Sequence, residues 1–318
     1  MKPSEMPKIK KTLLVGSTGL VGQNLLASYD FDTAVHSTNV SEAFIDEYSL
    51  VVYAGVTGTK YLANRFPEKD LQVIDSALGN LQQIKAEKIV LISTVDVYEH
   101  PFGKDEDNPV DDMQASAYGR HRAFLEKAVR NEYPHALFVR LPAIYGIGLK
   151  KNFVYDMIHA SPSRLEAQRY QEFAEESSLI KENYIEAENG FYALRDDASL
   201  ESLDAWFSNS SFNALSFTDS RSTYQFYDLS CLWGHIQQAL AQNLHVLNIA
   251  TPPISAGEAY QFIFDNAWTN HLASPVVQYD IKSKYFSNER GFSGYSQSKE
   301  EALSRLKRFV TAQMAASS

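Results

Sequence analysis

The chain has 318 residues, of which 44% are hydrophobic and 21% are charged, as is typical of a soluble globular protein with a substantial core. Its net charge of −10 argues against non-specific binding to nucleic acid or to an anionic membrane, but leaves room for a local basic pocket. The sequence contains no run of 18 apolar residues and no apolar region of a secretion signal near its start. The single Cys231 cannot form an internal disulfide, so we expect a cytoplasmic protein in which Cys231 is a small core residue.

Short apolar runs alternate with helix-compatible segments along much of the chain. Strands are predicted at 11–15, 33–37, 50–56, 88–94, 136–146 and 245–250, and helices from near Leu20, over 70–85 and over 229–240. The strand sequences are rich in β-branched residues, which is typical of strands buried on both faces. This alternation predicts an α/β fold built on a doubly wound parallel Rossmann sheet, with a smaller C-terminal substrate domain.

The sequence changes in character after Lys150. Residues 151–215 are polar and mostly helix-compatible, so they are interpreted as an inserted cap that is more mobile than the sheet. Residues 299–310 then place apolar residues on one helical stripe. We expect residues 1–150, with 222–250 returning to them, to form the dinucleotide-binding domain. Residues 151–221 and 251–318 are expected to form the substrate-binding cap region.

Three glycines, Gly16, Gly19 and Gly22, follow the first predicted strand and open the first predicted helix. Glycines at such a turn let the backbone approach a pyrophosphate, whose negative charge is favoured at a helix N-terminus. The alternative is that these glycines serve only the turn itself. Their place directly after the first strand favours a dinucleotide site.

This glycine turn and five later motifs, in the same order, resemble the extended short-chain dehydrogenase/reductase family of sugar-nucleotide epimerases, dehydratases and reductases. The motifs are "LISTVDVYEH" (91–100), "EDNPVDDMQASAYGRHRAFLE" (106–126), "VRLPAIYGIG" (139–148), "RSTYQFYDL" (221–229) and "LNIATPPISAGEAYQFI" (247–263). The resemblance implies a nicotinamide cofactor, a nucleotide-sugar substrate and a homodimer that pairs through helices around 72–85 and 118–132. The middle insertion and the residues after about 265 match poorly.

The resemblance also implies which residues contact the cofactor. They are Gly16, Thr18, Gly19, Leu20, Val21, Gly22, Ser37, Ala54, Gly55, Tyr118, Arg122 and Pro142. For Ala54 and Gly55, plain packing is an equal alternative. Where NAD-binding members end the second strand with an acidic residue, this chain has His36-Ser37-Thr38-Asn39, with neither a carboxylate to repel a 2′-phosphate nor an arginine to bind one. NADP is therefore favoured over NAD. The short link from Val40 to Ser49 predicts that the usual third strand and its helix are missing.

The catalytic residues implied by the resemblance are Thr94, Tyr118 and Arg122. Thr94 would polarise the substrate, and Tyr118 would be the acid. Arg122 stands four residues after Tyr118, on the same helix face, where the family carries a lysine. Arginine keeps the positive charge that lowers a phenol pKa and can bind the cofactor ribose, but it cannot release a proton near neutral pH. Alternatively, Arg122 is a solvated helix arginine beside a packing tyrosine.

Val95 stands where dehydratases carry a proton donor, which argues against 4,6-dehydration. Asp96 is interpreted as a loop residue or as one that supports the site without touching the substrate. Reduction of a 4-keto sugar and epimerisation through a transient ketone remain as predicted activities. The rival interpretation is a sensor or scaffold that binds the cofactor without turnover.

Several further residues receive predictions. Asn152 and Arg221 are candidate substrate ligands, the latter for a diphosphate, and Asn189 and Tyr192 are weaker candidates. Asp228 is expected to cap a helix, and His121 is expected to be exposed. No His, Cys, Asp or Glu cluster has metal-ligand spacing, so no metal site is predicted.

Overall fold

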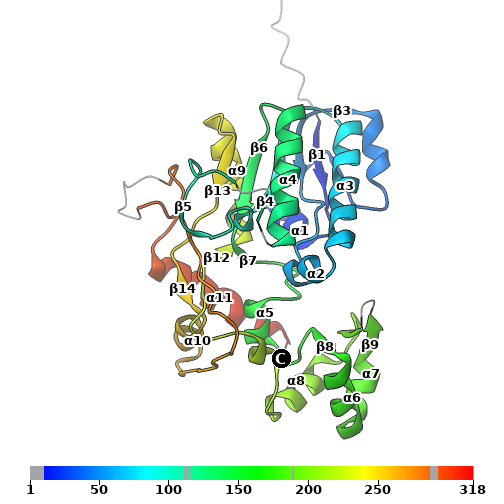
Figure 1. The fold of residues 1–318 in the computed structure, drawn as a ribbon, viewed down its shortest axis with the longest axis vertical. Coiled ribbons are helices and arrows are strands. Elements are labelled where there is room, and N and C mark those ends of the chain that lie inside the picture. The colour runs from blue at the N-terminus through cyan, green and yellow to red at the C-terminus, as the bar shows by residue number, and fades with distance from the viewer. Residues whose placement is uncertain (1–10, 111–112, 115, 188–189, 287–292, 318) are drawn as a thin grey trace, which may run out of the picture. The chain divides into compact units, whose positions relative to one another are not determined.

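The computed structural model describes residues 11–110, 113–114, 116–187, 190–286 and 293–317 (Figure 1). The chain divides into two compact units. The first unit consists of the chain up to Gly148 together with Gln225–Pro253 and Tyr279–Lys299. The second unit consists of Leu149–Tyr224, Ile254–Gln278 and the chain from Glu300 onward. Residues 279–299 therefore belong to the first unit, which is the unit that contains the glycine turn.

A six-stranded parallel sheet forms the centre of the first unit, with the strand order β13-β6-β4-β3-β1-β2. This sheet confirms the predicted fold class. Its strands are β1 (Thr12–Val15), β2 (Thr33–Val35), β3 (Glu47–Tyr53), β4 (Lys85–Thr94), β6 (Leu137–Leu141) and β13 (Val246–Asn248).

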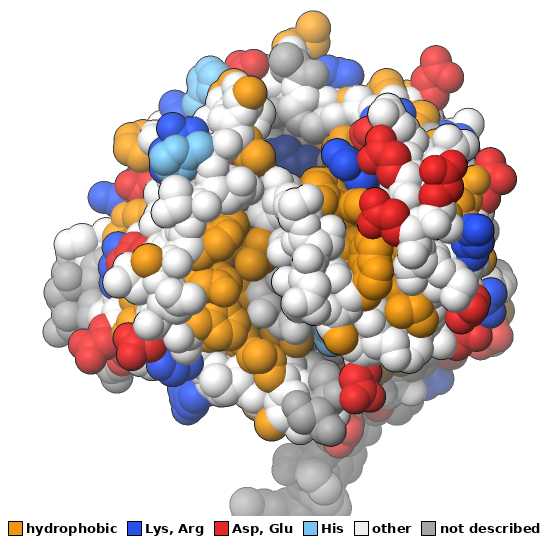
Figure 2. All heavy atoms as spheres, turned by 90° about the horizontal axis from the view of Figure 1, so that it is seen from below, with side chains coloured by type: hydrophobic (Ala, Val, Ile, Leu, Met, Phe, Trp, Pro, Cys, Tyr) orange, Lys and Arg blue, Asp and Glu red, His pale blue; other side chains and the backbone are white. Residues whose placement is uncertain are grey.

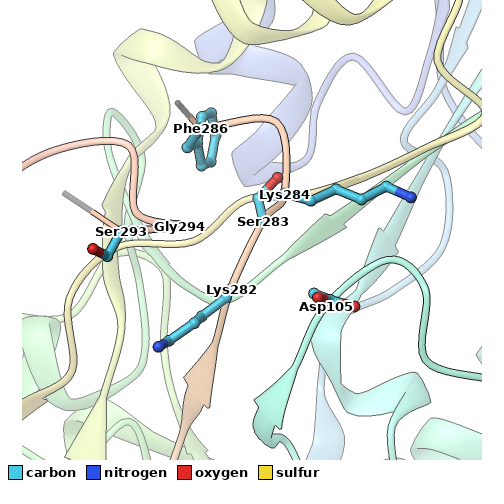
Figure 3. A pocket seen from close by; sticks show the side chains of 7 residues that line it. All are labelled: Asp105, Lys282, Ser283, Lys284, Phe286, Ser293 and Gly294. Atoms are coloured by element: carbon cyan, nitrogen blue, oxygen red, sulfur yellow. The ribbon is translucent and has the colours of Figure 1, made fainter. Parts of the chain in front are cut away.

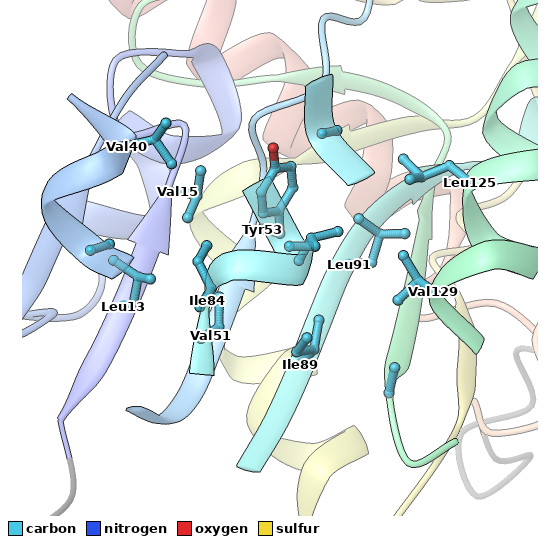
Figure 4. Packing of buried hydrophobic residues seen from close by; sticks show 14 of the residues in the cluster. Leu13, Val15, Val40, Val51, Tyr53, Ile84, Ile89, Leu91, Leu125 and Val129 are labelled. Atoms are coloured by element: carbon cyan, nitrogen blue, oxygen red, sulfur yellow. The ribbon is translucent and has the colours of Figure 1, made fainter. Parts of the chain in front are cut away.

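Helices cover both faces of this sheet because successive side chains of a buried strand point to opposite faces. On β1, Leu13 and Val15 belong to one core cluster, whereas Leu14 belongs to the other. The first cluster packs α3 (Pro67–Gln83) and α4 (Ala117–Glu132) on the sheet (Figures 1 and 4). The second packs α1 (Leu20–Leu26) and α9 (Leu232–Ala241) on the other face, with Cys231 partly buried against it.

The short link after β2 forms a 3-10 helix, η1 (Val40–Ile45), which leads directly into β3. β2 is consequently an edge strand of the described sheet. No strand beyond β2 is present among the described residues, as the short link predicts.

Shorter elements complete the first unit. These are α2 (Lys60–Arg65), η2 (Val95–Val97), β5 (Phe102–Lys104), β7 (Ala143–Tyr145), β12 (Phe226–Asp228), η4 (Leu229–Cys231) and β15 (Asp280–Ile281). Among them, β5 pairs with β15 and β7 pairs with β12, and both pairs are parallel.

The second unit contains its own hydrophobic core and a three-stranded antiparallel sheet, β8-β10-β9. Leu165, Phe173, Ile180, Leu203 and Phe207 are buried in this core. The expectation of a mostly helical cap misses this sheet, because strands of three or four residues are too short to show an alternating pattern. The elements up to residue 217 are α5 (Phe153–Ile158), β8 (Arg164–Glu166), α6 (Ala167–Glu176), α7 (Ser178–Asn183), β9 (Tyr184–Ala187), β10 (Phe191–Leu194), α8 (Leu200–Ser208) and η3 (Ala214–Phe217).

The rest of the second unit comes from later parts of the chain. It contains β11 (Thr223–Tyr224), β14 (Ile254–Ser255), α10 (Ala256–Phe264) and α11 (Lys299–Ser317), the last of which begins in the first unit. On α11, Ala302, Leu303, Leu306 and Val310 are buried, which confirms the predicted apolar stripe.

Lys and Arg side chains are scattered over the face drawn in Figure 2 and do not gather into one basic patch. None of the helices within the described ranges is both long and apolar enough to cross a membrane.

Candidate active site

The carboxyl ends of the parallel strands bring the predicted cofactor residues to one edge of the sheet. Val15 at the end of β1 is in register with Val35 on β2 and with Tyr53 on β3. Gly16 and Ala54, which follow these strands, therefore lie at the same edge, and Pro142 follows the end of β6 there. This edge is where open parallel sheets bind their ligands.

The glycine turn uses its three glycines in different ways. Gly16 has a φ of +91°, and a Cβ there would lie 2.5 Å from the Ala54 carbonyl oxygen. A Cβ on Gly22 would lie 2.1 Å from the Gly16 carbonyl oxygen. The fold itself therefore requires both of these glycines. At Gly19 the nearest atom to a Cβ would be 3.4 Å away and Gly19 is exposed, so this position remains open for a ligand.

The other residues of the turn and of the second strand's end are accessible to different degrees. Thr18 and Ser37 are exposed, whereas Leu20 and Val21 are partly buried against the second core cluster. The Asn39 side chain accepts a hydrogen bond from the His36 backbone N–H at 2.8 Å and donates one to Glu42 at 3.3 Å. Glu42 is therefore an acidic group near the end of β2, contributed by η1, which the strand-end sequence alone does not reveal.

Thr94 and Tyr118 come from different elements of the first unit. Thr94 ends β4, and Tyr118 lies in the first turn of α4, whose N-cap Ser116 accepts a hydrogen bond from Gly119. The Tyr118 backbone N–H donates to Asn64 at 2.9 Å. Burial raises the pKa of the Tyr118 phenol to about 12, while the Arg122 charge and a hydrogen bond with Thr94 act to lower it. The side chains of Thr94 and Tyr118 therefore lie near one another, as catalysis by this pair would need.

A buried ion pair holds α4 against the sheet. Arg140 on β6 donates to Glu126 on α4 through two nitrogens, at 3.0 and 2.6 Å. Ser93 donates to the same carboxylate at 2.6 Å. The arginine of the "VRLPAIYGIG" motif thus has a structural role that fixes the helix bearing Tyr118.

Arg122 is buried in an ion pair and is not a solvated helix arginine. Its guanidinium donates to Asp70 on α3 at 2.5 Å and to the Thr57 carbonyl at 2.7 Å. Its central carbon also lies 4.0 Å from the centroid of the Tyr118 ring. Only 4% of Arg122 is exposed. Asp70 therefore balances much of the positive charge through which Arg122 is expected to act on Tyr118.

The expectation that His121 is exposed is wrong. His121 is buried, and its Nδ1 lies 2.7 Å from the Asp70 carboxylate that also binds Arg122. The neighbouring helix α3 brings Asp70 to this face of α4, and a single helix considered alone cannot reveal that contact. The sequence does not single out Asp70, which is one of two acidic residues in the helix predicted over 70–85.

Asp96 is the centre of a polar cluster beside Thr94. Its carboxylate is 3.3 Å from the Thr94 hydroxyl, and it accepts hydrogen bonds of 2.6 Å from both Lys60 and Tyr279. Lys60 also donates to the Tyr279 hydroxyl at 2.8 Å. Nothing in the sequence marks Lys60 or Tyr279, because they lie far from Asp96 in the chain and belong to none of the motifs.

The two predicted substrate ligands belong to the second unit, where each has a local partner. Asn152, at a φ of 99°, caps α5 by accepting hydrogen bonds from Val154 and Tyr155. Arg221 forms a two-point ion pair with Asp219, at 2.9 and 2.6 Å, and this pairing lowers the pKa of the Asp219 carboxyl. The Arg221 side chain remains 49% exposed.

The remaining predictions concern three residues. Asp228 accepts a hydrogen bond from Ser230 at the start of η4, which confirms its predicted role as a helix cap. Tyr192 stacks on Tyr170 in the second unit, with ring centroids 3.6 Å apart. Asn189 lies outside the described residues.

A separate hollow of about 310 Å³ lies in the first unit (Figure 3), and its lining consists of Asp105, Lys282, Ser283, Lys284, Phe286, Ser293 and Gly294. The side chains of Lys282 and Lys284 extend in opposite directions, and Lys284 pairs with Asp107. The two ammonium groups therefore do not converge on a common anion, and none of the predicted site residues lines this hollow.

No family model and no curated protein matches the sequence. Solved structures do match nearly the whole chain. A dTDP-4-dehydrorhamnose reductase from Bacillus anthracis in complex with NADP is 16% identical, with a TM-score of 0.61 and coverage of 96% of this chain and 100% of that chain. The Bordetella bronchiseptica enzyme WbmG in complex with NAD and UDP is 11% identical, with a TM-score of 0.61 and coverage of 98% and 96%. A UDP-glucose 4-epimerase from Thermotoga maritima, with UDP-glucose, is 11% identical, with a TM-score of 0.58 and coverage of 95% and 99%.

The chain thus has the Rossmann-type fold of the extended short-chain dehydrogenases and reductases, and the resemblance stated from its motifs is confirmed at the level of the fold. At these identities the likeness concerns the fold, and the chemistry has to be argued from the site itself.

Proposed function

We propose that this protein is an NAD(P)-dependent oxidoreductase or epimerase of nucleotide sugars, acting by reduction of a 4-keto sugar or by epimerisation through a transient ketone. The observation that carries the proposal is that Thr94, at the end of β4, and Tyr118, in the first turn of α4, lie near one another around Asp96, at the strand edge that also bears the glycine turn. The solved structures of similar fold, with NAD, NADP, UDP or UDP-glucose bound, support the choice of ligand classes.

The residues at the edge of the sheet fit a dinucleotide. Gly19 has no side chain to fill the space beside the turn, and Thr18, Ser37 and Gly55 are also exposed. These residues, together with Gly16, Ala54 and Pro142, would hold the cofactor, with the start of α1 toward its phosphates. When bound, the nicotinamide supplies or accepts a hydride. Every other step belongs to the protein's own side chains.

Tyr118 and Thr94 would share the proton chemistry. In the direction of reduction, Tyr118 transfers its phenolic proton to the carbonyl oxygen of the substrate while Thr94 holds that oxygen by a hydrogen bond. Gly58 leaves room for the substrate there, because a Cβ on it would lie 3.8 Å from the Tyr118 hydroxyl. Arg122 would act from behind the phenol ring, through its charge, and not by direct contact with the cofactor ribose.

We also propose that the protein prefers NADP to NAD. Ser37 and Thr38 are exposed and would tolerate a 2′-phosphate, whereas Glu42 brings a carboxylate to the neighbouring Asn39. Calorimetry with NADPH and NADH tests the preference, and a Glu42→Gln variant should bind NADPH more tightly relative to NADH. More than tenfold tighter binding of NADH by the parent protein would reverse it.

A panel of nucleotide-linked 4-keto sugars and their alcohols, supplied with NAD(P)H or NAD(P)⁺, tests the activity. We expect hydride transfer, seen as a change in absorbance of the reduced cofactor, with at least one UDP- or dTDP-linked sugar. The rival function is a sensor or scaffold, and the buried, acid-paired Arg122 is the observation that favours it. Tight cofactor binding without hydride transfer across the whole panel would support the rival.

A further inference from the structure

Because Arg122 is paired with Asp70, its positive charge does less to stabilise the ionised form of the Tyr118 phenol. Three charged groups act on Tyr118. They are Arg122 on its own helix, Asp70 on α3 and Asp96 on η2. The two carboxylates act against ionisation of the phenol and Arg122 acts in favour of it. His121, on α4, also contacts the Asp70 carboxylate, at 2.7 Å.

Lys60 balances the second of these carboxylates. Its ammonium lies 2.6 Å from Asp96, and the Tyr279 hydroxyl contacts both groups, at 2.8 and 2.6 Å. Asp96 in turn is 3.3 Å from the hydroxyl of Thr94. Lys60 is therefore connected to Thr94 through its contact with Asp96, and all three residues belong to the first unit.

The backbone around Asp96 is packed directly against the first turn of α4. A Cβ on Gly119 would lie 2.1 Å from the Asp96 carbonyl oxygen, so only glycine allows this approach. The Asp96 backbone is consequently fixed beside the first turn of α4, and hydrogen bonds from Lys60 and Tyr279 hold its carboxylate there.

We propose that Lys60 is a positioning residue for Tyr118, and that by pairing with Asp96 it supplies the balancing positive charge that Asp70 takes from Arg122. The inference rests on the proposed function, in which Tyr118 gives or takes the proton. Lys60 does not touch the reacting atoms. It holds the Asp96 carboxylate and thereby sets how readily the phenol ionises.

A substitution series with an NMR readout tests the inference without any substrate. Tyrosine labelled with ¹³C at Cζ reports the fraction of Tyr118 that is phenolate at a fixed pH near 11, and loss of one signal in Tyr118→Phe identifies it. Lys60→Arg, whose guanidinium stays charged at that pH, should show a roughly tenfold higher fraction than Lys60→Met, which corresponds to about one pKa unit. Lys11→Arg and Lys11→Met, which should not differ, are the matched control pair, because Lys11 is similarly exposed, 52% against 45%, and also pairs with an aspartate, Asp46.

The same variants are then compared in the Asp96→Asn background. If Lys60 acts through Asp96, Lys60→Arg and Lys60→Met should give equal phenolate fractions there, and Asp96→Asn alone should raise the fraction. Equal fractions in the two Lys60 variants with Asp96 present, or the same difference between them in both backgrounds, would overturn the inference.

Turnover separates this inference from the proposed function. In the oxidation direction at pH 8, where the phenolate acts as base, Lys60→Met should lose about tenfold in kcat with KM for NADP⁺ changed less than about twofold. Loss of turnover in Tyr118→Phe with a parental rate in Lys60→Met overturns the inference alone. Parental turnover in Tyr118→Phe would instead overturn the proposed function.

Discussion

Tyr118 is the residue on which the proposed chemistry depends most directly. Tyr118→Phe removes only the hydroxyl, so cofactor binding should be nearly unchanged while turnover falls by about 10²–10⁴-fold. Because burial raises the pKa of this phenol to about 12, the group stays protonated below that pH. Reduction, which uses the acid, should therefore keep its kcat/KM well above pH 10, whereas oxidation, which uses the base, should rise with pH. Steady-state kinetics in both directions check this, and a fall of the reductive rate near pH 8 would contradict it.

Arg122 should contribute to stability as well as to catalysis. Arg122→Met leaves the buried Asp70 carboxylate without its cation, a change that typically costs about 3–5 kcal/mol. Arg122→Lys keeps the charge but loses the two-sided geometry that reaches both Asp70 and Thr57, so its loss should be smaller. Urea unfolding measures both values. The Arg122→Met, Asp70→Asn double variant should recover much of the loss, and an equally unstable double variant would show that the ion pair is not the cause.

Gly19 offers a cleaner test of the cofactor site than Gly16. A side chain at Gly16 would collide with the backbone of Ala54, so Gly16→Val should unfold the turn whether or not a cofactor binds. Gly19→Ala meets no such obstacle in the protein and should weaken NADPH binding by at least tenfold, because its methyl group enters the space for the pyrophosphate. Calorimetry measures the affinity. Gly79→Ala on α3, where a Cβ meets nothing within 4 Å, is the control.

At the scale of elements, the insertion should behave as a folded body with its own core. Phe207 is fully buried and packs against Phe173, Tyr184 and Trp206. Phe207→Ala should therefore destabilise this region by about 3–5 kcal/mol, which Trp206 fluorescence during urea unfolding would report. Phe217→Ala, at a position 54% exposed, should have little effect. Equal responses of the two variants would argue against a packed core here.

The sequence predicts the apolar strands of the central sheet well and the short strands of the second unit poorly. The buried runs at 11–15 and 88–94 are recognisable as strands because both of their faces are apolar, and the glycine turn is recognisable because Gly16 and Gly22 have no room for a side chain. The strands β8, β9 and β10 have only three or four residues each, and no periodicity is visible over such a length.

The residues of the candidate site likewise fall into those that the sequence predicts and those that it does not. Thr94 and Tyr118 stand in motifs that can be recognised along the chain. The residues around them do not: Asp70 lies on α3, Lys60 on α2 and Tyr279 just before β15. Such contacts depend on how helices and strands pack together, which local sequence patterns do not encode.

At the scale of the whole molecule, neither unit is a continuous segment of the chain. Removal of residues 300–318 should destabilise the second unit, since it removes the buried Ala302, Leu306 and Val310. NADPH binding, which we assign to the first unit, should survive the truncation. Calorimetry and urea unfolding of the truncated protein measure the two effects. Loss of binding together with loss of the second unit would contradict the assignment.

The discontinuous first unit also has a consequence for synthesis on the ribosome. The sheet cannot be completed until β13 has been made, and the segment 279–299 joins it later still, after the whole insertion has emerged. The core around Phe207 can therefore form while β6 still lacks its neighbour and exposes an unpaired edge. The nascent chain should be most prone to aggregation in this interval, and most dependent on chaperones, until residues 246–248 close the sheet.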